Sequence, residues 1–95
     1  MKEHEEILTV SRFYKVLSDP TRLKILMFLK DGERNVSSIS EKLAMEQSAV
    51  SHQLKLLRDN RLVKARRDGK AMLYSLDDHH VLDILDQTFQ HILHQ

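Results

Sequence analysis

The chain contains no cysteine, and this absence excludes several chemistries together. Without a thiol there is no disulfide, thiolate metal site, cysteine nucleophile or thiol redox sensor. The chain also lacks tryptophan, and its five Phe and Tyr residues are expected in the core, so no aromatic platform for RNA bases is indicated. No uncharged apolar run approaches the roughly 18 residues of a membrane span. The polar, acidic residues 1–6 do not resemble a signal peptide, so we expect a cytoplasmic protein.

Proline and glycine are scarce, with one and two residues respectively. This scarcity indicates a mainly helical chain with few sharp turns. A length of 95 residues fits one domain, expected over residues 1–95. Because so short a chain buries a modest fraction of its surface, we expect it to gain stability by forming an oligomer.

The charged residues are unevenly distributed, although the formal net charge is only +1. Residues 1–46 carry equal numbers of acidic and basic side chains, and residues 47–75 carry seven Lys and Arg against two Asp. Residues 76–95 carry four Asp and no Lys or Arg. A basic segment followed by an acidic, histidine-bearing tail indicates a polyanionic partner for the first and a cationic ligand for the second. Randomly distributed surface charge is the alternative.

Apolar residues recur at helical spacing in four segments before residue 60. The first helix is expected over about residues 5–17. Asp19 followed by Pro20 is typical of an N-cap and first helical position, which predicts a second helix over 20–29. Residues 35–43 and about 47–59 predict two short helices joined by a tight turn, which is the helix-turn-helix pattern. The expected buried residues of these two helices are Val36, Ile39, Leu43, Val50, Leu54 and Leu57.

The remaining segments predict a hairpin and a final helix. Residues 62–67 and 71–76 alternate in polarity around Asp68-Gly69, a strong signal for a two-stranded β-hairpin. A helix-turn-helix followed by a basic hairpin is a winged helix-turn-helix, a mainly α (α+β) fold with the hairpin as its wing. The last helix, about 77–93, is more apolar than a small monomer can cover. We therefore expect a homodimer formed through the terminal helices.

The helix over 47–59 has a polar face suited to the major groove of double-stranded DNA. Side chains at its start and on this face can address base edges, while nearby cations neutralise phosphates. A solvent-exposed helix face and hairpin edge are the alternatives. The residues expected to bind DNA are Gln47, Ser48, Ser51, His52, Lys55, Lys64, Arg66, Arg67 and Lys70.

The last helix carries candidate metal ligands at both ends. Asp78 and His80 lie at its start, and His91 and His94 share a face near its end. His80 and His91 are separated by about 16 Å along a helix, whereas ligands of one ion lie about 2 Å from it. One helix therefore cannot form the site, but two antiparallel copies can form two identical ones. Three imidazoles and a carboxylate suit Zn(II), and Co(II) fits the same tetrahedral set.

Several of these segments resemble the ArsR/SmtB family of metal-sensing repressors. Residues 16–26, Val-Leu-Ser-Asp-Pro-Thr-Arg-Leu-Lys-Ile-Leu, resemble the family signature, residues 47–57 its recognition helix and residues 69–76 its wing. The tail pattern Asp-x-His-x10-His-x2-His is similar to the zinc- and cobalt-sensing CzrA/SmtB-like branch. The family also has a cysteine site on the third helix, which residues 36–39 do not match.

The resemblance implies a homodimer that binds operator DNA without metal and releases it when Zn(II) or Co(II) binds. It also implies a link from His91 to the start of the wing near Arg61. Four protein ligands leave no open coordination position, so a regulatory or structural metal is expected and an enzyme is not.

Three other classes of protein remain as alternatives. A small metallohydrolase would need an open metal position and a general base, for which the sequence offers no candidates. A winged-helix regulator of the same family could hold structural zinc, or no metal, and respond to another signal. A protein-interaction module or RNA binder would bind without regard to duplex sequence. Neither a membrane nor a small organic substrate is an expected partner.

Overall fold

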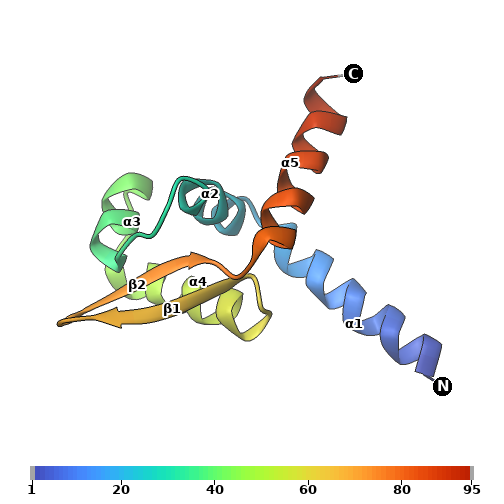
Figure 1. Cartoon of the computed structure of the whole chain (residues 1–95), viewed down its shortest axis with the longest axis horizontal. Coiled ribbons are helices and arrows are strands. Elements are labelled where there is room, and N and C mark those ends of the chain that lie inside the picture. Colours follow the sequence, from blue (N-terminus) through green and yellow to red (C-terminus); the bar gives the residue numbers. More distant parts are fainter. Residues whose placement is uncertain (1, 95) are drawn as a thin grey trace.

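The computed structural model describes residues 2–94, which form a helix-turn-helix with a β-hairpin wing and two projecting helices (Figure 1). The winged helix-turn-helix expected from the sequence is therefore confirmed. In chain order the elements are α1 (Lys2–Leu17), α2 (Pro20–Leu29), α3 (Val36–Leu43), α4 (Gln47–Asp59), β1 (Val63–Asp68), β2 (Ala71–Leu76) and α5 (His79–Leu93). Helix α1 begins earlier than expected because Glu3 and Glu5 place negative charge in its first turn, where the helix dipole favours it.

The core lies where α2, α3 and α4 meet the base of the hairpin and the first half of α5. Val50, Leu54 and Leu57 of α4 are fully buried, as their spacing predicted. Val36 and Leu43 of α3, which were also expected to be buried, are only half-buried and pack against the edge of this core. The buried core residues are Ile25, Leu26, Leu29, Ile39, Val50, Leu54, Leu57, Leu62, Val63, Val81 and Leu85.

Local hydrogen bonds define the ends of α2 and α3. The Asp19 carboxylate accepts the backbone N–H of Arg22 at 3.1 Å, which confirms the expected N-cap of α2. Asn35 caps α3 in the same way, accepting the N–H of Ser38 at 2.8 Å. Helix α3 ends at Ala44 in the left-handed conformation, with φ 54°. This residue reverses the chain tightly and directs it into α4.

The wing turn lies one residue further along the chain than expected. Asp68 pairs with Ala71, so the two central residues of the turn are Gly69 and Lys70, not Asp68 and Gly69. Of these two central residues, only Gly69 has a positive φ, of 63°. A turn of type I′ needs positive φ at both central positions, whereas type II′ needs it at the first position only, where glycine is favoured.

A short segment before α3 extends the wing sheet. Arg34 forms a bridge with Tyr74, in which each backbone N–H donates to the carbonyl of the other residue at 3.0 and 2.8 Å. Since Tyr74 directs both backbone groups toward Arg34, residues 33–34 run along the edge of β2 opposite β1. The middle strand is therefore β2.

The terminal helices α1 and α5 extend away from this body in different directions (Figure 1). Helix α5 is held by Val81 and Leu85 in the core and by an ion pair of 3.0 Å between Lys30 and Asp86. Its far end and most of α1 are solvated. Large apolar side chains on both helices are 42–64% exposed, namely Ile7, Leu8, Val10, Tyr14, Ile92 and Leu93.

Within residues 2–94, no helix combines the length and the apolar character that crossing a bilayer requires.

Candidate functional site

Helix α4 presents the polar face that was expected to read DNA. Its apolar residues are buried in the core, so the side chains on the opposite face are exposed, namely Gln47, Ser48, Ser51, His52 and Lys55. The Gln47 amide donates to Ser37 Oγ at 3.1 Å, which connects the starts of the two helices of the motif. Lys55 forms an i,i+4 ion pair of 3.1 Å with Asp59. The pair is well exposed, so Asp59 competes only weakly with a phosphate for Lys55.

Arg22 of α2 links α4 to the end of α1 through hydrogen bonds. Its guanidinium donates to the carbonyl of Val16 at 2.8 Å, near the end of α1. It also donates to the side-chain oxygen of Gln53, on α4, at 3.4 Å. Arg22 was not among the expected site residues, because its two partners lie 6 and 31 residues away and no helical spacing relates them.

The wing carries four exposed cations: Lys64, Arg66, Arg67 and Lys70. Alternation along β1 places Lys64 and Arg66 on the face that points away from the core, and Lys70 lies in the turn. Arg66 is committed to Glu33, with Nε donating to Oε2 at 2.6 Å and a terminal nitrogen donating to Oε1 at 2.8 Å. The hydrogen bond from Arg66 lowers the pKa of Glu33, and the same bond raises the pKa of Arg66.

The first pair of expected metal ligands is adjacent at the start of α5. Asp78 is the N-cap, and its Oδ1 accepts the backbone N–H groups of His80 at 2.9 Å and Val81 at 3.4 Å. Partial desolvation raises the pKa of Asp78, but the bonds from the His80 side chain and from these N–H groups outweigh it and hold the pKa below its usual range. Because Asp78 caps the helix, α5 begins at His79, later than the expected residue 77.

The second pair, His91 and His94, lies at the other end of α5. Both side chains are exposed and line a shallow depression together with Gln87 and Gln90, so they share a face. Within residues 2–94 of one chain, no three His, Cys, Asp or Glu side chains lie close enough together to hold a metal ion. His79, which is not among the expected ligands, lies 3.6 Å from Asp83 one turn along the helix.

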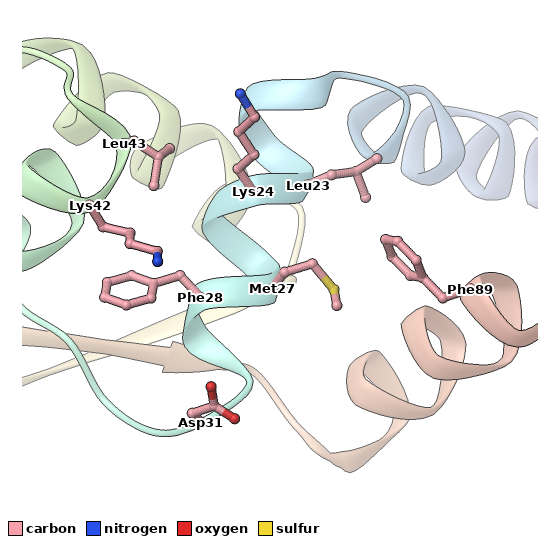
Figure 2. A pocket seen from close by; sticks show the side chains of 8 residues that line it. All are labelled: Leu23, Lys24, Met27, Phe28, Asp31, Lys42, Leu43 and Phe89. Carbon is pink, nitrogen blue, oxygen red and sulfur yellow. The ribbon is translucent and has the colours of Figure 1, made fainter. Parts of the chain in front are cut away.

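A cavity of about 620 Å³ separates α5 from α2 and α3 (Figure 2). Phe89 of α5 points across it toward Leu23 and Met27, and Lys42 lies over the ring of Phe28 at 5.8 Å. An apolar groove adjoins this cavity and shares Leu23 and Phe89 with it. Packing between α5 and the body is therefore incomplete in one chain, and no residue of the expected DNA or metal sites lines the cavity.

Comparison with known proteins bears on this arrangement. Residues 19–65 match the family described as "Bacterial regulatory protein, arsR family". Over 85 residues the chain is 44% identical to the HTH-type transcriptional regulator NmtR of Mycobacterium tuberculosis, an alignment that covers 90% of this chain and 71% of that protein. The chain belongs to the ArsR family of transcriptional regulators. This ArsR-family chain is a DNA-binding regulator and not an enzyme, as expected from the sequence.

Two further relatives extend the comparison. The chain is 39% identical over 83 residues to the transcriptional repressor SmtB homolog of Synechocystis sp., covering 87% of this chain but only 63% of that protein. Its fold matches the solution structure of the homodimeric winged helix-turn-helix DNA-binding domain of Mb0332 from Mycobacterium bovis. That match has a TM-score of 0.87 and 31% identity, and covers 98% of this chain and 90% of the other.

Proposed function

We propose that this ArsR-family regulator is a single-domain, homodimeric repressor that binds operator DNA and releases it when Zn(II) or Co(II) binds between its C-terminal helices. The observation that carries the proposal is that two exposed pairs of candidate ligands lie at opposite ends of α5. Asp78 and His80 occupy one end, and His91 and His94 the other. Each end supplies half of a four-ligand set, so completing a set requires a second copy of the helix.

The exposed apolar surface of the terminal helices supports the homodimer. Ile7, Val10 and Tyr14 are 52–60% exposed on α1, and Ile92 and Leu93 are each 64% exposed on α5. So many large apolar side chains on two helices are typical of an interface, because isolated surface residues are common but contiguous ones are not. A second copy would cover these residues and the apolar groove beside Phe89. Mb0332, which shares the fold, is homodimeric.

The exposed face of α4 and the wing support DNA binding by a division of roles. Gln47, Ser48, Ser51 and His52 carry the donors and acceptors that base edges recognise. Lys55, Lys64, Arg67 and Lys70 supply positive charge for phosphates, which contributes affinity that falls as salt rises. Two copies related by a twofold axis would present two such faces to successive major grooves.

The four proposed ligands fit a zinc or cobalt ion by their chemistry. Imidazole nitrogen and carboxylate oxygen are ligands that both ions accept, and all four side chains are exposed at the two ends of α5. When bound, the ion would supply a cross-link between the two helices. The link from His91 to the wing near Arg61 stays a prediction. The SmtB homolog of Synechocystis is a transcriptional repressor, which supports the proposed repressor role.

The test is a zinc titration of affinity for the DNA upstream of the protein's own gene. Zinc should weaken binding by wild type and by His79→Ala, whose side chain is paired with Asp83 outside the proposed set. His91→Ala should bind the same DNA but keep its affinity as zinc is added. Undiminished release in His91→Ala would refute the ligand assignment. Zinc that raises thermal stability without changing DNA affinity would instead identify a structural metal.

A further inference from the structure

The residues before α3 connect three parts of the DNA-binding surface in consecutive positions. Glu33 binds Arg66 of β1 through two hydrogen bonds, and Arg34 pairs with Tyr74 of β2. Asn35 then caps α3, the first helix of the helix-turn-helix. A stretch of three residues therefore joins both strands of the wing to the motif that carries the recognition helix.

The Glu33–Arg66 pair crosses the middle strand of this small sheet. Residues 33–34 lie on one side of β2 and Arg66 lies on the other, where it is registered with Leu73. The pair therefore passes over the face that carries Ser75 and Lys64, both of which border the same small hollow. Backbone pairing alone can slide or twist at a short edge, whereas a two-bond contact between carboxylate and guanidinium has a defined geometry.

We propose that Glu33 is a positioning residue for the wing and that Arg66 serves as its anchor, not as a phosphate ligand. The inference rests on the DNA-binding role proposed above and adds a division among the wing cations. Lys70 in the turn and Arg67 beside it would contact phosphates. Arg66 would hold the hairpin at a defined angle to α3 and α4, because two of its five N–H groups are already bound to Glu33, whose carboxylate also offsets its positive charge.

The charge state of the pair agrees with this role. The pKa of Glu33 is lowered and that of Arg66 is raised by their mutual hydrogen bond, so both remain ionised at neutral pH. The pair is partly exposed, at 36% for the Glu33 side chain and 58% for that of Arg66. Exposed pairs make small contributions to stability. Loss of the pair should therefore leave the fold intact while the wing becomes less constrained.

The experiment measures how affinity for a random-sequence duplex of about three helical turns depends on salt. Affinity falls as salt rises, and each phosphate contact makes the slope of log affinity against log salt steeper by about 0.9. Arg67→Gln should therefore make the slope shallower by about 0.9. Arg66→Gln and Glu33→Gln should leave the slope unchanged, and each should weaken binding by about twofold to fivefold because the wing is no longer held in place. The double variant should bind no more weakly than either single one.

A variant in which the two charges are exchanged provides the decisive test. The variant Glu33→Arg/Arg66→Glu rebuilds the pair with its signs reversed, so an anchoring role predicts recovery of affinity relative to Arg66→Glu alone. A phosphate ligand at position 66 predicts no recovery. The proposal is overturned by that result or by a slope for Arg66→Gln as shallow as that of Arg67→Gln. Stronger DNA binding by Glu33→Gln, or unchanged DNA affinity in both single variants, would also overturn it.

Two further measurements separate this inference from the proposed function. Amide hydrogen exchange of Arg34 and Tyr74 in the protein without DNA should become faster in Glu33→Gln, and unchanged exchange would contradict the anchor. The random duplex tests phosphate contacts without an operator. Failure of wild type to prefer the DNA upstream of its gene would therefore count against the proposed repressor and leave the slope comparison valid.

Discussion

The Asp78 carboxylate lies 3.4 Å from Nδ1 of His80, and the same oxygen accepts the backbone N–H of His80 at 2.9 Å. One side chain therefore caps α5 and also faces its proposed fellow ligand. The cap fixes the carboxylate at the start of the helix, where its position does not depend on a metal. Capping and metal binding can be separated by substitution.

Asp78→Asn should separate the two roles, because Asn and Asp are comparable N-caps but an amide oxygen is a much weaker zinc ligand. We expect the thermal midpoint to change little and zinc affinity to fall by at least about tenfold. Competition with a chelating dye measures the affinity. Asp78→Ala is the comparison, since it should lose both stability and zinc binding. Equal zinc affinity in Asp78→Asn and wild type would remove Asp78 from the ligand set.

The exposed apolar residues of α1 should control the oligomeric state. Burial of a Val side chain contributes about 2 kcal/mol. Val10→Glu should therefore raise the dimer dissociation constant by at least about thirtyfold, as measured by sedimentation equilibrium. Thr9→Glu is the matched control, because it adds the same charge at the neighbouring exposed position, off the apolar stripe. Equal dissociation constants for the two variants would place the dimer interface elsewhere.

Ala44 adopts a left-handed conformation at the end of α3, with φ 54° and ψ 49°. Glycine adopts this conformation without the steric penalty of a Cβ, so Ala44→Gly should raise the free energy of unfolding by about 0.5–1 kcal/mol. Ala49→Gly, at an exposed position inside α4, should lower it by about 1 kcal/mol. Urea denaturation of both variants tests the pair. Destabilisation of similar size in both would show that the turn at Ala44 gains nothing from glycine.

The Glu33–Arg66 pair should make stability depend on acid pH. The hydrogen bond from Arg66 lowers the pKa of Glu33 below its ordinary value of 4.5. The pair therefore contributes its full stability above that ordinary value and loses it as pH falls through the lower pKa of the folded state. The difference in denaturation midpoint between wild type and Glu33→Gln should narrow as pH falls from about 5 to about 3. A difference that is constant over this range would contradict the assignment.

Local rules acting over a few residues determined much of this fold. Asp19 and Pro20 start α2, the spacing of Val50, Leu54 and Leu57 defines the buried face of α4, and all are recognisable because caps and helical periodicity are short-range. The wing was predictable from the alternation of polar and apolar residues in its two strands and from the glycine between them. Its turn was misplaced by one residue, because the cross-strand pairing of Asp68 with Ala71 decides which residues are central.

Other relationships were decided only by the tertiary structure. Glu33 and Arg66 are 33 residues apart, and Arg22 and Gln53 are 31 apart, so no local pattern relates either pair. They meet because hydrophobic burial packs α2, α3, α4 and the hairpin around one core. The chain's own amino acids thus specified the elements, the charge of each segment and the types of ligand on α5. Which polar side chains of distant elements meet follows from packing, which acts between surfaces and leaves no periodic trace along the chain.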